Sequence, residues 1–287
     1  MNITLDASAL DQRHFSRAQL DAFFDAILIN DEVDAETPLP EAVAFDFEPI
    51  LLIDCYRLSR QLWKEGVDRR AMIALTAKLR RDRDLGPEDR LAFKYARAKI
   101  KQVRFACALF GAHHSYPTIL DWMTTALGHL QDAFKTGQRA AVWREALLCR
   151  LFLARGPYAL LRRGIDRLRP ATSAGFRAYL FDQIDGLRDI LARGTLTGAQ
   201  FHAARKVISR QIAFYTALDV IQPSERNHRM TRLLAAINGR MGRMHDELVD
   251  RREAGTLDYH GHHFDLPDDI RARLTALVSL YPAGPAS

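Results

Sequence analysis

The sequence predicts an all-α protein of about ten helices. Apolar residues recur at helical spacing along most of the 287 residues, and Gly or Pro residues separate the periodic segments. No stretch rich in Val or Ile alternates with polar residues, as a half-buried strand would. Nearly half of the residues are hydrophobic, a fraction typical of a globular chain that can bury a large core.

Start and stop signals delimit the expected helices. Asp68 and Thr197 suit N-cap positions, Pro87 suits a first helical turn, and Gly111 suits a helix end. The helices are therefore expected at residues 16–30, 45–65, 69–81, 87–110, 117–134, 138–155, 156–170, 173–193, 197–222, 224–252 and 267–281. In the segment 138–155, the residues expected to face the core are Trp143, Leu147, Leu148, Leu151 and Phe152.

Charge is distributed unevenly along the chain. Residues 1–59 hold three Lys or Arg against twelve Asp or Glu, so the net charge of +6 leaves +15 for the rest. A basic body favours an anionic partner, although the same charge can also serve solubility alone. We divide the chain into an acidic N-terminal segment with one helix, two helical repeats and a disordered tail, at residues 1–41, 42–155, 156–281 and 282–287.

The cysteines and the apolar runs bear on the compartment. Cys55, Cys107 and Cys149 are far apart in apolar helical surroundings, which favours buried free thiols in a reducing compartment. The first ten residues lack the basic and apolar regions of a secretory signal. No apolar run approaches the roughly 18 residues that a membrane span requires. We therefore expect a cytoplasmic protein with no membrane span.

The helix expected at residues 87–110 carries a basic stripe. At about 100° per residue, four of its cations fall within an arc of roughly 80°, while its apolar residues cluster on another face. The four cations are Lys94, Arg97, Lys101 and Arg104. They span roughly 15 Å along the axis, which is room for several phosphate groups.

A weaker copy of this helix lies 108 residues later, from Phe201 to Leu218. The residues that coincide are Phe93 with Phe201, Ala96 with Ala204, Arg97 with Arg205, and Ile100 with Ile208. His202 takes the place of Lys94. Two similar helices in separate parts of the chain predict two related four-helix-bundle-like halves.

The two segments resemble the repeats of CHAD domains, a helical family named for conserved histidines on α-helices. In that family a first helix carries a His, an Arg three residues later and further basic residues, and a second helix carries an LG- or LQD-like segment. The residues that match are Lys94, Arg97, Lys101 and Arg104 before LGHLQDAF, and His202, Arg205 and Arg210 before INGRMGRMHDELV. The chain departs from the family pattern at Lys94, where the family has His, and at Ser209 and Ile212, where it has basic residues.

The resemblance implies paired helical bundles with a basic groove between them that binds inorganic polyphosphate. It also implies a binding protein rather than an enzyme, with no cofactor. Arg offers a planar fork for phosphate oxygens, and Lys offers a mobile point charge. We therefore expect binding of polyphosphate or a similar polyanion through the seven residues matched above, with nucleic acid as an alternative polyanion.

Two other functions stay open. The basic faces can pair with Asp and Glu of the same chain, as in a helical scaffold that binds a protein partner. His245–Asp246 resembles the metal-binding pair of helical phosphohydrolases, and His260, His262 and His263 form a denser cluster. Neutral imidazoles bind transition metals, but no spacing in the sequence supplies further ligands. We therefore expect no metal and no catalytic residue.

Overall fold

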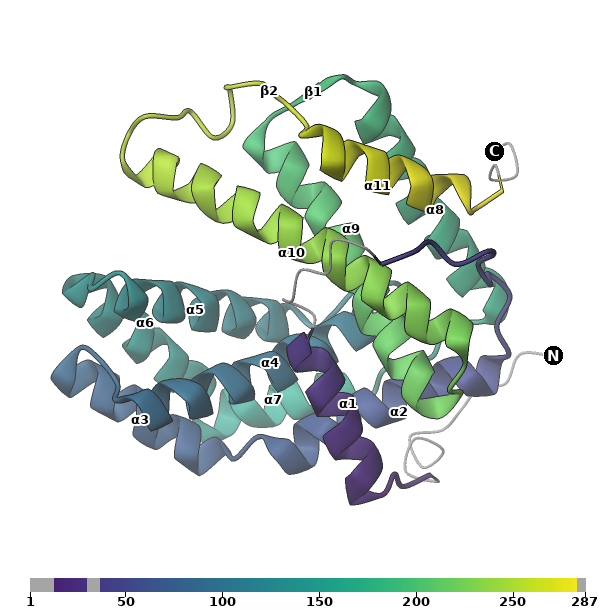
Figure 1. Ribbon diagram of the computed structural model, residues 1–287. Coiled ribbons are helices and arrows are strands. Elements are labelled where there is room, and N and C mark those ends of the chain that lie inside the picture. The colour runs from purple at the N-terminus through teal and green to yellow at the C-terminus, as the bar shows by residue number, and fades with distance from the viewer. Residues whose placement is uncertain (1–12, 30–36, 283–287) are drawn as a thin grey trace. The chain divides into compact units, whose positions relative to one another are not determined.

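The computed structural model describes residues 13–29 and 37–282, and this part of the chain is almost entirely helical. It contains eleven α-helices and two strands of two residues each (Figure 1). The all-α fold class that the sequence predicts is confirmed. In the same residues, no helix combines the length and the apolarity needed to cross a bilayer. Of the predicted tail, residues 283–287 lie outside the described ranges.

The chain divides into two compact units. The described residues of the first unit are 13–24 and 52–171, and those of the second are 25–29, 37–51 and 172–282. The division after residue 171 differs from the boundary at 155/156 that the sequence suggests, so residues 156–171 belong to the first unit. The basic groove expected between the two halves stays a prediction.

The first unit is built from the helices that lie between residues 17 and 166. Most of α1 (Arg17–Ile29) and of α2 (Pro49–Gly66) belongs to this unit. The helices that lie entirely within it are α3 (Arg69–Asp82), α4 (Pro87–Phe110), α5 (Thr118–Lys135), α6 (Arg139–Phe152) and α7 (Arg155–Asp166). The α3, α4, α5 and α6 helices pack on one another in the pairs α3–α4, α3–α6, α4–α5 and α5–α6. Tyr56 is fully buried, and its hydroxyl donates a 2.6 Å hydrogen bond to the carbonyl of Ile165, which ties α2 to α7.

The α6 helix turns a different face to the core from the one expected. Trp143 is 42% exposed, Leu148 37% and Leu151 57%, so the prediction that these residues are buried is wrong. The buried apolar positions are Val142, Ala146, Cys149 and the following Leu153. The packed side of α6, which contacts α3 and α5, is therefore formed by these smaller side chains and by Glu145. The error arose because two faces of α6 carry apolar residues at helical spacing.

The second unit contains the long helices of the C-terminal half. Its elements are α8 (Ser173–Ala192), β1 (Thr195–Leu196), α9 (Gly198–Ile221), α10 (Glu225–Glu253), β2 (Phe264–Asp265) and α11 (Asp268–Ser279). The α9 helix starts at a capping box, in which Thr197 and Gln200 bond reciprocally, as the sequence suggests for Thr197. The two strands pair antiparallel, with Thr195 opposite Asp265. The α9 helix packs on both α8 and α10, and its Phe214 ring lies 5.0 Å from that of Phe176.

Candidate anion-binding sites on two helix pairs

The four cations of the predicted stripe on α4 differ in how far they are exposed. The helix begins at Pro87, and its first turn contains Glu88 and Asp89, whose carboxylates interact favourably with the positive end of the helix dipole. Its apolar side is buried, as expected, at Phe93, Ile100, Val103, Cys107 and Phe110. Lys94 and Lys101 are exposed, whereas Arg97 and Arg104 are half-buried. The two arginines therefore have neighbours that a solvated stripe would lack.

Arg97 lies against the backbone of α5 at Gly128. A Cβ atom added to Gly128 would stand 3.2 Å from Nη2 of Arg97, closer than ordinary van der Waals contact. Gly128 itself is buried, and the helix continues through it. A side chain at this position would require the guanidinium to move by a few tenths of an ångström. We call this arrangement, in which an arginine guanidinium lies against a glycine of the neighbouring helix, a glycine seat.

Arg104 is held by the segment that follows α4. Its Nη2 lies 2.6 Å from a carboxylate oxygen of Asp121 and donates a 2.8 Å hydrogen bond to the hydroxyl of Tyr116. Its guanidinium also lies over the Tyr116 ring, 4.2 Å from the centroid. Asp121 therefore offsets the charge of Arg104.

The second unit repeats the glycine seat between α9 and α10. A Cβ atom on Gly242 would stand 3.1 Å from Nη2 of Arg205 and 3.7 Å from its Cζ. Arg205 is half-buried, and its Nε has no hydrogen-bond partner among the residues that the structure describes. Within those residues Arg205 also has no ion-pair partner. Arg205 is thus a partly desolvated cation that no carboxylate of the described residues pairs with.

Two histidines adjoin Arg205. The His202 ring stacks on that of His245 in α10, with the centroids 4.8 Å apart and the planes inclined at 32°. Burial lowers the pKa of His202 to about 4, and the charges of Lys206, His245 and Arg205 act in the same direction. Burial and the charge of Arg205 also lower the pKa of His245, against the opposing effect of Asp246. Both imidazoles are therefore neutral near pH 7.

Arg210 does not belong to this cluster. Its Nη1 donates hydrogen bonds to the side-chain Oε1 of Gln183 at 2.7 Å and to the Tyr179 hydroxyl at 3.2 Å, both on α8. Arg205 instead faces α10, because the five-residue spacing rotates the two arginines roughly 140° apart on the helix. The structure thus brings His202 and Arg205 together and directs Arg210 elsewhere.

The glycine seats were missed at the level of sequence. Gly128 and Gly242 each stand four residues before an acidic residue, Asp132 and Asp246, in the stretches GHLQD and GRMHD. This shared Gly-to-Asp spacing was a signal that could have found them. A glycine inside a helix costs stability relative to alanine, so two such residues at matching places indicate a steric need.

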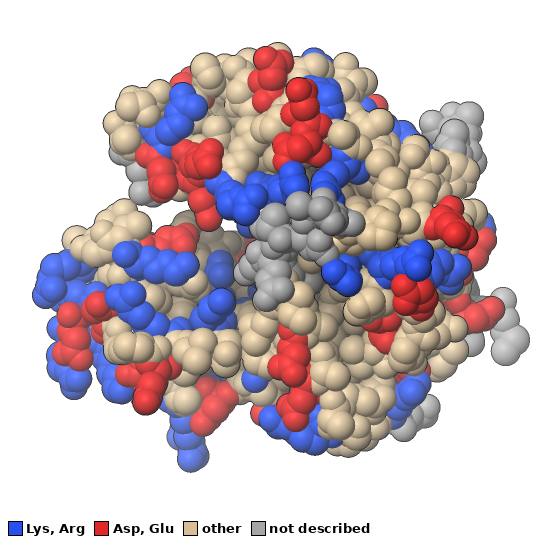
Figure 2. Space-filling model, in the orientation of Figure 1, with Lys and Arg blue, Asp and Glu red and all other residues tan. Residues whose placement is uncertain are grey.

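The surface of the first unit also carries many cations outside the stripe. Figure 2 shows Lys and Arg gathered over the ends of α3, α5 and α6, with Asp and Glu interspersed among them. Such mixed charge is typical of a solvated surface, and we assign it no site.

The His–Asp pair and the histidine cluster considered as metal ligands both lie in the second unit. His245 Nδ1 lies 3.5 Å from the carboxylate of Asp246. Within residues 13–29 and 37–282, no three His, Cys, Asp or Glu side chains are grouped closely enough to hold a metal ion. The cluster of His260, His262 and His263 falls within these ranges.

Comparisons of the chain with known protein families, with curated proteins and with solved structures found no match. The resemblance to CHAD domains therefore rests on the residues of the two helix pairs alone.

Proposed function

We propose that the chain binds inorganic polyphosphate, or a polyanion of similar charge density, through the α4–α5 and α9–α10 pairs. The observation that carries the proposal is the guanidinium of Arg205, which is half-buried on Gly242 with no ion-pair partner among the described residues. Partial burial of a cation costs free energy unless a counter-charge offsets it. A phosphate group bound beside Arg205 would supply that charge.

The chemistry of the two seats suits a chain of phosphates. Polyphosphate carries about one negative charge per phosphate and is flexible, so an array of donors recognises it better than a shaped pocket. The guanidinium groups of Arg97 and Arg205 lie against helix glycines, and partial burial restricts the positions open to them, which reduces the entropy lost when they bind. The exposed amines of Lys94 and Lys101 lie on the same helix as Arg97 and can add point charges.

The residues of the proposal are not equivalent. Arg97 and Arg205 are its centre, with Lys94, Lys101 and His202 beside them. Arg104 and Arg210 already bond to neighbouring side chains, Arg104 to Asp121 and Arg210 to Gln183. These two contacts are the ones that a purely structural role for the basic stripes would produce. We assign them a supporting part in positioning α4 and α9.

The wider setting belongs to the proposal as well. The order of the basic residues resembles that of CHAD domains, and polyphosphate binding follows from that resemblance. Cys55, Cys107 and Cys149 are buried free thiols, which supports a reducing compartment such as the cytoplasm.

Paired charge removal tests the proposal. The double variant Arg97→Gln/Arg205→Gln removes both seated arginines, and the control Arg139→Gln/Arg193→Gln removes two exposed arginines with no ion-pair partner among the described residues. Charge-assisted hydrogen bonds to phosphate predict a loss of about tenfold or more in affinity for polyphosphate in the first variant. The control should lose only the smaller effect of net charge.

Urea unfolding of each variant separates binding from folding. Equal losses of affinity in the two double variants, at unchanged stability, would show that only net charge matters and would refute the seats. A short single-stranded RNA, titrated in the same buffer, tests the alternative polyanion. Tighter binding of the RNA than of polyphosphate would overturn the proposed ligand.

A further inference from the structure

The first unit also contains a basic cavity, and neither Arg97 nor Gly128 lines it. The end of α2, the start of α3 and the first turns of α7 enclose an open cavity of about 440 Å³. This volume falls within the range of roughly 300–1,000 Å³ typical of small-molecule sites. Among the described residues that line the cavity, none is acidic, and four are cationic.

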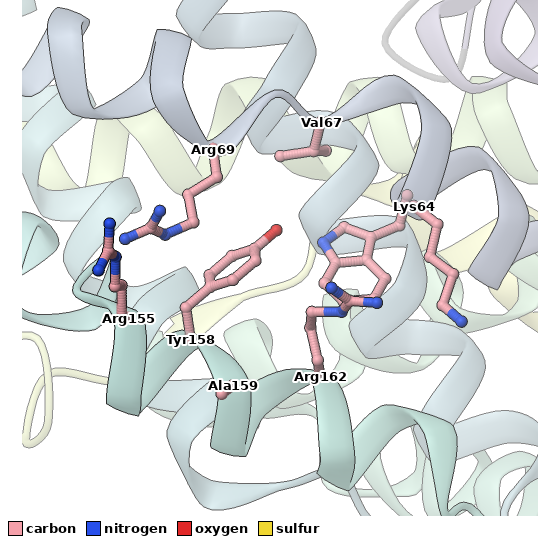
Figure 3. A pocket seen from close by; sticks show the side chains of 8 residues that line it. Lys64, Val67, Arg69, Arg155, Tyr158, Ala159 and Arg162 are labelled. Carbon is pink, nitrogen blue, oxygen red and sulfur yellow. The ribbon is translucent and has the colours of Figure 1, made fainter.

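Three guanidinium groups surround one aromatic ring in this cavity. Figure 3 shows Arg69 and Arg155 on one side of Tyr158 and Arg162 on the other. Arg69 is fixed in place, because its Nε donates a 2.7 Å hydrogen bond to the Leu153 carbonyl and its guanidinium lies 5.7 Å from the Tyr158 centroid. Arg155 and Arg162 are exposed and have no ion-pair partner among the residues that the structure describes.

The fourth cation is already engaged. The Lys64 amine lies 3.0 Å from a carboxylate oxygen of Asp166, which also pairs with Arg60 at 2.7 Å. In Figure 3 this amine points away from Tyr158. The excess positive charge of the cavity therefore comes from its three arginines.

The remaining wall of the cavity is apolar and aromatic. Trp63 and Val67 also line the cavity, and both side chains are largely buried. The Trp63 and Tyr158 rings lie 6.3 Å apart between centroids. Inorganic phosphate or polyphosphate would make no use of such a wall, whereas a planar ring could pack on it. The cavity thus combines a place for several negative charges with a place for an aromatic group.

We infer that this cavity binds a nucleoside di- or triphosphate, with the phosphates at Arg69, Arg155 and Arg162 and the base against Tyr158. Guanidinium groups suit phosphate because their planar forks bond two oxygens at once. Stacking on an aromatic side chain suits any nucleobase. The inference concerns binding and assigns no reaction, and it does not depend on polyphosphate binding at the seats.

Calorimetric titration of the full chain carrying Arg97→Gln/Arg205→Gln, which removes both seated arginines, with ATP, tripolyphosphate and adenosine tests the inference. Tripolyphosphate has no base to stack on Tyr158, so it should bind about tenfold more weakly than ATP. Adenosine has no phosphates, so its affinity should be lower than that of ATP by at least the same factor. Binding of tripolyphosphate as tight as that of ATP would overturn the assignment of a nucleotide, as would the absence of ATP binding.

Variants of the α7 helix locate the binding. The double variant Arg155→Gln/Arg162→Gln should lower ATP affinity about tenfold or more through lost charge-assisted contacts. Arg163→Gln, an adjacent exposed arginine outside the cavity, should leave the affinity within about twofold of wild type. Equal affinities in the double variant and in Arg163→Gln would overturn the location.

The aromatic contact has its own test. Tyr158→Phe keeps the ring and should keep ATP affinity, whereas Tyr158→Leu should reduce it about tenfold. Urea unfolding shows whether each variant remains folded, and equal ATP affinities of the two folded variants would overturn the stacking. The seat variant Arg97→Gln/Arg205→Gln should bind ATP as wild type does, which keeps this result separate from that for polyphosphate.

Discussion

Replacing the two seat glycines should separate stability from binding. Gly128→Ala and Gly242→Ala each place a methyl group in the interior of a helix, at 3.2 Å and 3.1 Å from the Nη2 atoms of Arg97 and Arg205. Alanine in a helix interior is favoured over glycine by about 0.5–1 kcal/mol. The contacting atoms are ends of flexible side chains, so the arginines can move by a few tenths of an ångström without disturbing the core.

The expected outcome is a protein that is as stable as wild type, or more so, and binds polyphosphate more weakly. Two substitutions set an upper limit of about 1–2 kcal/mol on the gain in unfolding free energy. Displacing the seated guanidinium groups should reduce affinity for polyphosphate several-fold, because geometry governs bidentate contacts. Urea unfolding and titration with polyphosphate at low salt measure the two quantities.

Gly186→Ala supplies the matched control. Gly186 lies inside α8, and a Cβ atom there would meet no atom within 4 Å. This variant should gain about 0.5–1 kcal/mol of stability and keep its affinity for polyphosphate. The reasoning is refuted if the seat variants, stably folded, bind polyphosphate as tightly as the Gly186→Ala control does.

Three further predictions concern stability and reactivity. The pKa of His202 is lowered to about 4 in the folded protein, so as the pH falls the unfolded state binds the proton first. About 1–2 kcal/mol of unfolding free energy should therefore be lost between pH 7 and pH 5. His202→Gln should remove most of that dependence in urea unfolding, and an unchanged pH profile would contradict it. Asp54 is buried and pairs with Arg13 and with the buried Arg57. Asp54→Ala should therefore lower the free energy of unfolding by about 3–5 kcal/mol, whereas Asp246→Ala, at an exposed position, should lower it by well under about 1 kcal/mol. Burial raises the pKa values of Cys107 and Cys149 to about 12, so iodoacetamide at pH 8 should modify them only after unfolding; rapid labelling of the native protein would contradict their burial.

The sequence was sufficient for the helices because their limits are local. Pro87, Asp68 and Thr197 mark helix starts by chemistry that acts within one turn, and the structure confirms each of them. The buried side of α4 followed from its spacing alone. The same reasoning gave the wrong buried side for α6, because this helix has two apolar faces and only its packing partners decide which one is buried.

The contacts of the basic residues could be predicted only in part. Arg97 and Arg205 were identified because they recur at one spacing. The shared Gly-to-Asp spacing marks Gly128 and Gly242, but it does not show which side chains contact them, because the arginines lie on other helices. The pairing of Arg104 with Asp121 likewise depends on the path of the chain between α4 and α5. Residues that meet through tertiary packing are therefore the ones that sequence spacing missed.

The affinity of the full chain for inorganic polyphosphate, measured against salt concentration, tests the central claim most directly. Contacts of Lys94, Arg97 and Lys101 with three phosphates predict that the logarithm of the binding constant falls with the logarithm of salt at a slope of about −2 or steeper, by analogy with single-stranded nucleic acid. An absence of binding at about 50 mM salt, or an affinity that does not change with salt, would contradict the account.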